Sequence, residues 1–265
     1  MAIIPPRRLW YGRHPEMGQR GNGATSTIQF GMRESFFWHK VHSLTGIVPV
    51  GFYMVQHLTL NSFSLAGPSK FNGVIHFFAS VPQHFLLALE VFAIWLPLLF
   101  HAVYGVFIVA RNSDNYSEKA YKYRENRYYR LQRWTGILAF IYLLAHVFTT
   151  TFQAKTKGEA YIQYDAWNQL LTSNGYVFFI LYAVGVTACC YHLAYGIWNF
   201  CIRWGITISE KSQAATGRFA AFAFVALSLL GIGALYGFIN PIFASKEELI
   251  EARSGASLQP VRNDN

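Results

Sequence analysis

The sequence predicts an all-α fold, an integral membrane bundle of five transmembrane helices, and three observations predict it. Of the 265 residues, 53% are hydrophobic and only 13% are charged, whereas soluble domains have about 25% charged residues. Five apolar runs interrupt the charged segments, and about 20 apolar residues in a helix cross a bilayer. Basic residues are concentrated in alternate connections between these runs, as in multi-pass membrane proteins.

The five apolar runs divide the chain into three parts. The N-terminal segment 1–35 is rich in Gly, Pro and Arg, the membrane domain covers 36–243, and residues 244–265 form a polar tail. Because residues 1–35 contain no apolar stretch of signal-peptide length, the first helix is expected to act as its own insertion signal. A buried helical core of a soluble protein is the alternative, and five runs in one short chain disfavour it. The runs cover residues 36–62, 84–110, 132–153, 175–203 and 217–243.

The basic residues predict the orientation of the chain. Residues 1–40, 111–133 and 203–218 together hold sixteen Lys and Arg, against three in the connections 62–83 and 154–174. The positive-inside rule therefore places the N-terminus in the cytoplasm, and five crossings place the C-terminus outside. Because the net charge of +9 follows this alternation, a nucleic-acid-binding surface is disfavoured, and no nucleic-acid partner is expected.

The three cysteines all lie in the fourth apolar run and form no metal-binding or haem-attachment motif. They are Cys189, Cys190 and Cys201. Without a CxxCH or a paired CxxC pattern, covalently attached haem, a zinc site and a disulfide framework are all disfavoured. We interpret these residues as small core or lipid-facing side chains.

Four of the nine histidines lie well inside apolar runs, one in each of the first four helices. They are His57, His101, His146 and His192. An ionisable or metal-binding side chain inside a membrane is costly, so each is a candidate functional residue. A single histidine in this position could be a structural hydrogen-bonding group. Four of them, one per helix, favour a role as ligands.

The depths of these histidines sort them into two levels. The first and third helices run outward, which puts His57 and His146 in the outer half of the membrane. The second and fourth run inward, which puts His101 and His192 in the inner half. At ~1.5 Å per residue the two levels are roughly 15 Å apart. Two axial imidazoles at one level suit haem iron used for electron transfer, whereas zinc takes about four ligands. The sequence thus predicts two haem b groups.

Glycines keep register with the histidines of the second and fourth helices. His101 and His192 each open the pattern His-x-x-Tyr-Gly, which places Gly105 and Gly196 on the same helix face as the histidine. We expect these glycines to leave room for a flat macrocycle, and ordinary small-residue helix packing is the alternative. A second repeated pattern, a Thr-Gly pair ahead of the histidine, occurs in the first and third helices: Thr45-Gly46 and Thr135-Gly136.

Four stretches resemble the five-helix, two-haem cytochrome b subunit of succinate dehydrogenase and fumarate reductase. They are HSLTGIVPVGFYMVQH (42–57), LPLLFHAVYGVFIVARN (96–112), LQRWTGILAFIYLLAH (131–146) and the segment from His192 through WGITIS (204–209). The resemblance extends over about residues 36–240. It implies that His57 and His146 hold an outer haem and that His101 and His192 hold an inner one, the same pairs that the depths predict.

The resemblance also implies a role and partners. Subunits of this family have no catalytic flavin of their own, anchor a flavoprotein subunit and an iron–sulfur subunit on the cytoplasmic face, and exchange electrons with quinone. The implied location is the cytoplasmic membrane of a bacterium, with membrane lipid around the helices, and the implied quinone is menaquinone. Electrons are expected to pass from the iron–sulfur partner to the inner haem, the outer haem and a quinone near it. The longer segment 1–35 and the polar tail depart from the family pattern.

Quinone chemistry needs protons, and Glu90 is the only acid deep in an apolar run. It lies 11 residues before His101, about three helical turns, so the two are expected on one helix face at the outer-haem level. A protonated structural hydrogen-bonding role is the alternative. His76, on the outer connection, is a second candidate for quinone-linked proton transfer, or it faces water. Gln56 adjoins His57 and is expected to face another direction.

Haem propionates need cationic or hydrogen-bonding partners at the cytoplasmic level. Four residues lie at a suitable depth: His42, Ser43, Arg133 and Arg203. Arg203 is 11 residues past His192 and shares its helix face. Any of the four could instead be an interfacial anchor, which is the commoner role of arginine at a membrane surface.

Two other classes of function remain open at this point. One is the cytochrome b of another quinone-linked oxidoreductase, such as a bc complex, a hydrogenase or a formate dehydrogenase. The bc type takes its ligands from two helices with two histidines each, whereas here the third and fourth helices carry one each. The other class is a haem-free membrane anchor or transporter with proton-relay histidines.

Overall fold

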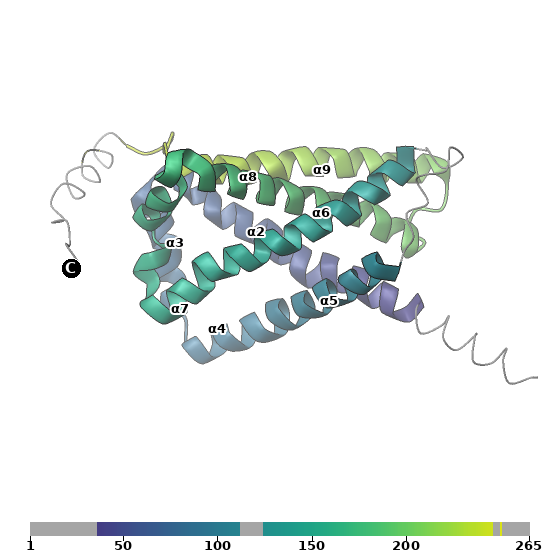
Figure 1. Cartoon of the computed structure of the whole chain (residues 1–265), viewed down its shortest axis with the longest axis horizontal. Coiled ribbons are helices and arrows are strands. Elements are labelled where there is room, and N and C mark those ends of the chain that lie inside the picture. Colours follow the sequence, from purple (N-terminus) through teal and green to yellow (C-terminus); the bar gives the residue numbers. More distant parts are fainter. Residues whose placement is uncertain (1–35, 112–123, 246–249, 251–265) are drawn as a thin grey trace, which may run out of the picture. The chain divides into compact units, whose positions relative to one another are not determined.

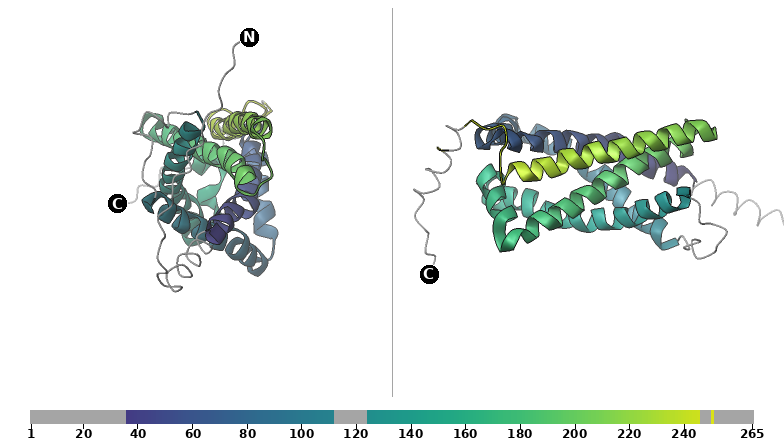
Figure 2. Two further views of the ribbon diagram at one scale, coloured as in Figure 1. Left: turned by 90° about the vertical axis from the view of Figure 1, so that its right-hand side faces the viewer. Right: turned by 90° about the horizontal axis from the view of Figure 1, so that it is seen from above.

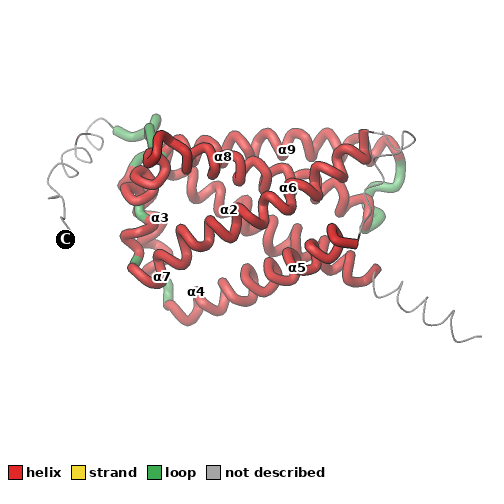
Figure 3. The backbone as a smooth tube through the Cα atoms, in the orientation of Figure 1, coloured by secondary structure: helices red, strands yellow, loops and turns green. Residues whose placement is uncertain are grey.

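The computed structural model describes residues 36–111, 124–245 and 250, and all of the regular structure in these residues is helical (Figures 1 and 3). This confirms the all-α prediction. The chain separates into two units, residues 1–38 and residues 39–265. The bundle described below belongs to the second unit. The predicted segment 1–35 and nearly all of the predicted tail lie outside the described residues.

Within the second unit, the first long helix covers residues 39–66 and changes its winding along the way. Residues 39–45 are helical. Three further segments follow without a break: the π-helix η1 (Gly46–Gly51), α2 (Phe52–Asn61) and the 3-10 turn η2 (Ser62–Ala66). Pro49 lies inside the π-helix, which fits the rule that proline has no N–H for the α-helical hydrogen bond.

The second and third long helices also combine α and π windings. The second begins with α4 (Gln83–Leu89), passes through the π-helix η3 (Glu90–Trp95) and ends with α5 (Leu96–Arg111). The third begins with α6 (Arg124–Val147), passes through the π-helix η6 (Phe148–Phe152) and ends with α7 (Gln153–Lys157). A π-turn holds one residue more than an α-turn, so it shifts every later side chain around the helix.

The last two long helices are α8 (Tyr164–Arg203) and α9 (Glu210–Gly237). Backbone angles leave the helical region from Ser173 to Tyr176, so α8 consists of a short cap segment, residues 164–172, and a long helix. The helix α9 begins earlier than the run 217–243 predicts, because the side chain of Ser209 accepts a hydrogen bond from the N–H of Ser212 in a capping box.

Around the bundle each long helix contacts the next. The first helix contacts α9, which contacts α8; α8 contacts α6, α6 contacts α5, and α5 closes the ring on η1 (Figure 2). The helix α8 also reaches η1 across the ring. Side chains from the first four long helices can therefore meet inside the bundle.

Short helices cover one end of the bundle, termed the outer end after the predicted topology (Figure 1). They are α3 (Pro68–Ser80), η7 (Glu159–Ile162) and the cap segment of α8. Tyr164 donates its hydroxyl to the carbonyl of Gly237, and Asn168 donates to the carbonyl of Phe238. Phe71, Tyr164, Trp167 and Phe238 belong to one buried cluster. The cap segment thus ties α3 and the end of α9 together.

Four helical stretches among the described residues are long and apolar enough to cross a membrane: Gln83–Arg111, Arg127–Lys157, Tyr164–Arg203 and Glu210–Gly237. Many large apolar side chains on these helices are exposed, as lipid-facing residues are. A helical membrane bundle is therefore supported. The first helix is not among the four, and it carries the polar Gln56, His57 and Asn61 in its apolar run. The count of five crossings and the orientation of the termini stay predictions.

Candidate haem-binding histidine pairs

The structure brings together the two histidines that the sequence assigns to the outer level. His57 on α2 and His146 on α6 have ring centroids 5.8 Å apart, and their planes cross at 81°. A tyrosine four residues earlier stacks on each ring: Tyr53 on His57 at 5.4 Å and Tyr142 on His146 at 5.6 Å. We call His57 and His146 the outer pair.

The two histidines of the outer pair also share a hydrogen bond to their backbone carbonyl. Four residues after each histidine, a polar side chain donates a hydrogen bond to the histidine carbonyl. Asn61 Nδ2 lies 2.8 Å from the oxygen of His57, and Thr150 Oγ1 lies 2.6 Å from that of His146. The pattern Tyr-x-x-x-His-x-x-x-Asn/Thr is therefore present twice. It is visible in the sequence, although our sequence analysis did not use it.

His101 on α5 and His192 on α8, termed the inner pair, meet in the same way. Their ring centroids are 6.0 Å apart and their planes cross at 81°. The Nδ1 of His101 lies 2.9 Å from the carbonyl oxygen of His42, and the Nδ1 of His192 lies 2.9 Å from that of Gln132. A carbonyl oxygen can only accept, so each Nδ1 carries the hydrogen and each Nε2 keeps its lone pair for a metal.

The distances between the rings fit a haem iron between them. Two metal–imidazole bonds of about 2 Å, plus about 1.2 Å from each nitrogen to its ring centre, separate two axial rings by roughly 6.4 Å. Both pairs lie close to this value. The buried Nδ1 of His146 has no hydrogen-bond partner in the described part of the chain. Within that part, no group of three or more His, Cys, Asp or Glu could hold a metal by itself, whereas a haem needs only two protein ligands.

The glycines that the sequence places beside the inner pair face side chains of the neighbouring helix. A Cβ atom on Gly105 would lie 3.2 Å from Cε1 of His42, and one on Gly196 would lie 3.3 Å from Nε2 of Gln132. Room for a macrocycle beside these glycines stays a prediction. Sequence reasoning missed that Gly46 and Gly136 lie against the imidazoles themselves, although it noted their Thr-Gly pattern.

The predicted propionate partners lie near the inner pair, and several have backbone partners. Arg203 donates to the carbonyl of His39 at 3.2 Å, and Arg133 to that of Val109 at 3.2 Å. The ring of His42 stacks on that of His101 at 4.0 Å, with planes 9° apart. Its buried Nδ1 has no hydrogen-bond partner among the described residues, so it is open to a polar group of a ligand.

Ser43 is tied to neighbouring residues in a different way. Its hydroxyl donates to the carbonyl of Lys40 at 2.8 Å and accepts from the indole N–H of Trp204 at 3.1 Å. The hydroxyl therefore links the first helix to the end of α8. These contacts fit an interfacial anchor, and a role for Ser43 toward a propionate stays a prediction.

The two predicted proton-transfer residues each pair with a charged residue near the outer end. Lys155 Nζ on α7 lies 2.7 Å from Oε2 of Glu90, at the start of η3. His76 Nδ1 on α3 lies 3.8 Å from Oε1 of Glu159. On a plain α-helix Glu90 would lie about three turns before His101, as expected from the sequence, but the π-turn of η3 lies between them and changes that spacing.

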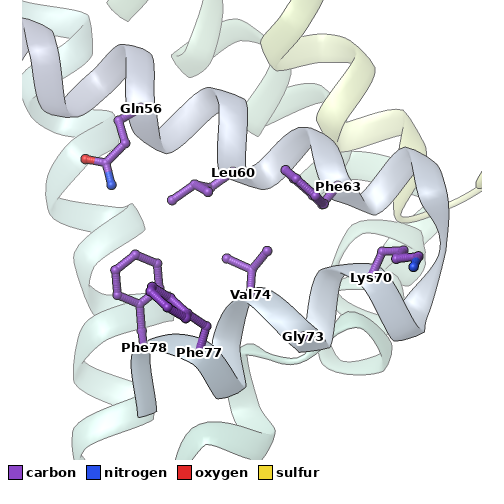
Figure 4. A pocket seen from close by; sticks show the side chains of 8 residues that line it. All are labelled: Gln56, Leu60, Phe63, Lys70, Gly73, Val74, Phe77 and Phe78. Atoms are coloured by element: carbon purple, nitrogen blue, oxygen red, sulfur yellow. The ribbon is translucent and has the colours of Figure 1, made fainter. Parts of the chain in front are cut away.

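A shallow groove of about 400 Å³ lies between α2 and α3 (Figure 4). Gln56 extends into the space between the two helices near Phe77 and Phe78, and Lys70 lies at the opposite end (Figure 4). Gln56 adjoins His57 in sequence, and its side chain is exposed on the groove side of α2. The groove is mainly apolar, with one amide and one ammonium group.

Comparison with known proteins identifies the family. The pattern of the family described as "Succinate dehydrogenase/Fumarate reductase transmembrane subunit" matches residues 111–231. The succinate dehydrogenase cytochrome b558 subunit of Bacillus subtilis is 39% identical over 209 residues, which is 79% of this chain and 99% of that protein. The chain belongs to this family.

Membership of the succinate dehydrogenase/fumarate reductase transmembrane subunit family confirms the resemblance found in the sequence. It accounts for the exposed apolar surface of the bundle, because a transmembrane subunit has lipid around it. The histidines that the structure pairs come from four different helices, and His146 and His192 lie within the matched residues.

Proposed function

We propose that this chain is the dihaem cytochrome b subunit of a bacterial succinate:quinone oxidoreductase. It anchors the flavoprotein and iron–sulfur subunits at the cytoplasmic membrane and passes electrons between them and quinone, with menaquinone as the quinone. The observation that carries the proposal is the meeting of four helix-borne imidazoles as two separate pairs, each with ring centroids about 6 Å apart. Its family supplies the identity of the complex.

The two pairs would hold the two haem b groups, the outer pair one and the inner pair the other. When bound, haem supplies one-electron redox chemistry at its iron. The protein orients the ligands: the carbonyls of His42 and Gln132 fix the hydrogen of each inner imidazole at Nδ1. Tyr53 and Tyr142 stack on the outer imidazoles.

The proposed topology has five crossings, with the N-terminus in the cytoplasm and the C-terminus outside. The first helix, 39–66, is the fifth crossing alongside the four long apolar helices. The basic connections then face the cytoplasm, on the side of the inner pair. The iron–sulfur partner would bind there, so the inner pair is the nearer of the two to it.

Quinone reduction takes up two electrons and two protons, and the outer end offers groups to supply the protons. Glu90 forms an ion pair with Lys155 at 2.7 Å. We assign His76 the relay of a proton from the outer surface and Glu90 its transfer: the carboxylate of Glu90 takes up this proton and then donates it to a quinone oxygen. Electron transfer from the inner to the outer side also responds to the membrane potential, by about 2.3 kcal/mol per charge per 100 mV.

Purification of the intact complex, followed by haem and subunit analysis, tests this function. Two haem b per chain, together with a flavoprotein and an iron–sulfur subunit and succinate:menaquinone activity, are expected. One haem or fewer per chain would overturn the dihaem assignment. A reduced-minus-oxidised spectrum without b-type bands would leave only a haem-free anchor.

A further inference from the structure

The inner pair is built by one arrangement of two antiparallel helices that occurs twice. In each copy, one helix supplies a residue and, four positions later, a glycine. The neighbouring helix supplies a histidine and, four positions later, a glycine. The two sets face each other. We call each copy a glycine lock. The first lock consists of His42, Gly46, His101 and Gly105, and the second of Gln132, Gly136, His192 and Gly196.

In the first lock the contacts are reciprocal. The imidazole of His101 packs against Gly46 and donates from Nδ1 to the carbonyl of His42 at 2.9 Å. In return, the side chain of His42 packs against Gly105, where a Cβ would be 3.2 Å from its Cε1. Each helix therefore supplies one glycine for a side chain of the other.

The second lock repeats these contacts between α6 and α8. The imidazole of His192 packs against Gly136 and donates from Nδ1 to the carbonyl of Gln132 at 2.9 Å. The side chain of Gln132 packs against Gly196, where a Cβ would be 3.3 Å from its Nε2. Two independent helix pairs thus place an imidazole in the same way.

We infer that Gly46 and Gly136 are positioning residues that set the ring planes of His101 and His192 as axial haem ligands. A Cβ on Gly136 would lie 2.8 Å from Cε1 and 3.0 Å from Nδ1 of His192, and a Cβ on Gly46 would overlap the ring of His101. Side chains in cores do not pack at such distances. An alanine at either position displaces the imidazole and breaks its bond to the carbonyl.

The hydrogen bond that holds the ring uses a backbone group, and the two locks differ in the side chain at that position. His42 stacks on His101, whereas Gln132 accepts a hydrogen bond from Asn199. The carbonyl geometry is nevertheless the same, 2.9 Å in both. The features that both locks share are therefore the glycine against the imidazole and the backbone carbonyl that accepts from Nδ1.

The inference rests on the proposed haem function, and its test separates the two. In the purified complex, Gly46→Ala and Gly136→Ala are compared with Gly233→Ala, where a Cβ would be 3.8 Å from Leu65 Cδ1. Haem per chain and the low-spin ferric EPR signals are measured. The inner haem is identified as the one that His101→Ala removes. A wild-type chain without two haems refutes the function, whatever the variants do.

With two haems in the wild type, either alanine variant is expected to lose the inner haem or to move its EPR signal, with the outer haem unchanged. Gly233→Ala is expected to keep both haems with unchanged signals. Unchanged inner signals in both Gly46→Ala and Gly136→Ala would overturn the lock.

If an alanine variant fails to accumulate, the imidazole that its added methyl group would clash with is removed as well. If Gly136→Ala prevents assembly, the double variant Gly136→Ala/His192→Ala is expected to restore an assembled complex with the outer haem, because the added methyl then meets no imidazole. Failure of the double variant, when His192→Ala alone assembles, would show that the clash lies elsewhere and would overturn the assignment.

Discussion

The imidazole of His57 lies 5.8 Å from that of His146, and the two ring planes cross at 81°. These residues are separated by 89 positions in the chain and come from α2 and α6. The pairing predicts that each ring is needed for one haem only. His57→Ala is therefore expected to lower the haem content from two to one per chain, with the inner haem retained.

Haem quantitation and the optical spectrum of the purified complex check this prediction. His84→Ala is a suitable control, because His84 lies in the exposed start of α4 and faces no other histidine ring among the described contacts. Loss of the inner haem alone in His57→Ala would contradict the pairing.

The crossing angle of 81° at both levels predicts the magnetic signature of the ferric haems. When the two imidazole planes are parallel, both rings interact with the same π-symmetry d orbital of the iron, and the energies of the two such orbitals differ. When the planes are perpendicular, each ring interacts with a different orbital, and the two energies stay nearly equal. Both haems are therefore expected to give strongly anisotropic low-spin EPR signals. A rhombic signal of the parallel-plane type at either level would contradict the ring geometry.

The pair formed by Glu90 and Lys155 predicts where quinone-linked protons enter. Glu90→Gln keeps the size and polarity of the side chain but removes the acid, so turnover with menaquinone is expected to fall by about 10²-fold, in the range of a lost general acid. Haem content and succinate oxidation with an artificial acceptor stay unchanged. Glu210→Gln, at the opposite end of the bundle, is the control.

The groove beside α2 provides the competing site for the quinone. If Gln56→Leu raises the KM for quinone while Glu90→Gln leaves turnover intact, the quinone ring binds between α2 and α3 and the assignment of Glu90 is wrong. If Glu90→Gln lowers turnover and Gln56→Leu changes neither constant, Glu90 is supported and the groove serves lipid only.

The π-helix of the first long helix predicts an unusual tolerance to deletion. Tyr53 follows Gly46 by seven residues, whereas Tyr142 follows Gly136 by six, yet both tyrosines stack on their histidines. The extra residue falls within η1, whose π-turn accommodates it. Deletion of Pro49 is therefore expected to give a plain α-helix with the spacing of the third helix and to keep two haems.

The matched deletion lies in the third helix, which is α-helical between Gly136 and His146. Deletion of Ile141 turns His146 by about 100° relative to Gly136, so the outer haem is expected to be lost and the inner one kept. The effect of each deletion is measured as the haem content of the purified complex. Equal loss of the outer haem in the two variants would show that η1 does not set the register.

Much of this arrangement could be predicted from the sequence, because helix periodicity and charge alternation are strong local signals. The helical fold is confirmed, and the depth of each histidine predicted the same two pairs that the structure brings together. Their role as haem ligands remains the proposal made above. The predicted runs overlap the long helices, but α6 begins at Arg124 and α9 at Glu210, seven or eight residues before the runs 132–153 and 217–243, and α9 ends at Gly237.

Other features could not be predicted, because they depend on backbone windings and contacts between helices. The partner of Glu90, Lys155, is 65 residues away in the chain, and the π-turn in η3 changes the face count that a plain α-helix suggests. The contact of His192 with Gly136 needs the relative heights of two helices to within one turn. The sequence shows the Thr-Gly pairs but does not indicate which side chain lies against them.

The cap segment of α8 has a consequence for how water reaches the centre of the protein. Trp167 stacks against His146 at 6.4 Å, and its aromatic neighbours Tyr164 and Phe238 are nearly fully buried. These aromatic side chains form a layer at the outer end of the bundle that lies against His146. Under the proposed function, this layer would separate an outer haem from the water beyond the cap, so that a proton for quinone would reach it from the side, between neighbouring helices.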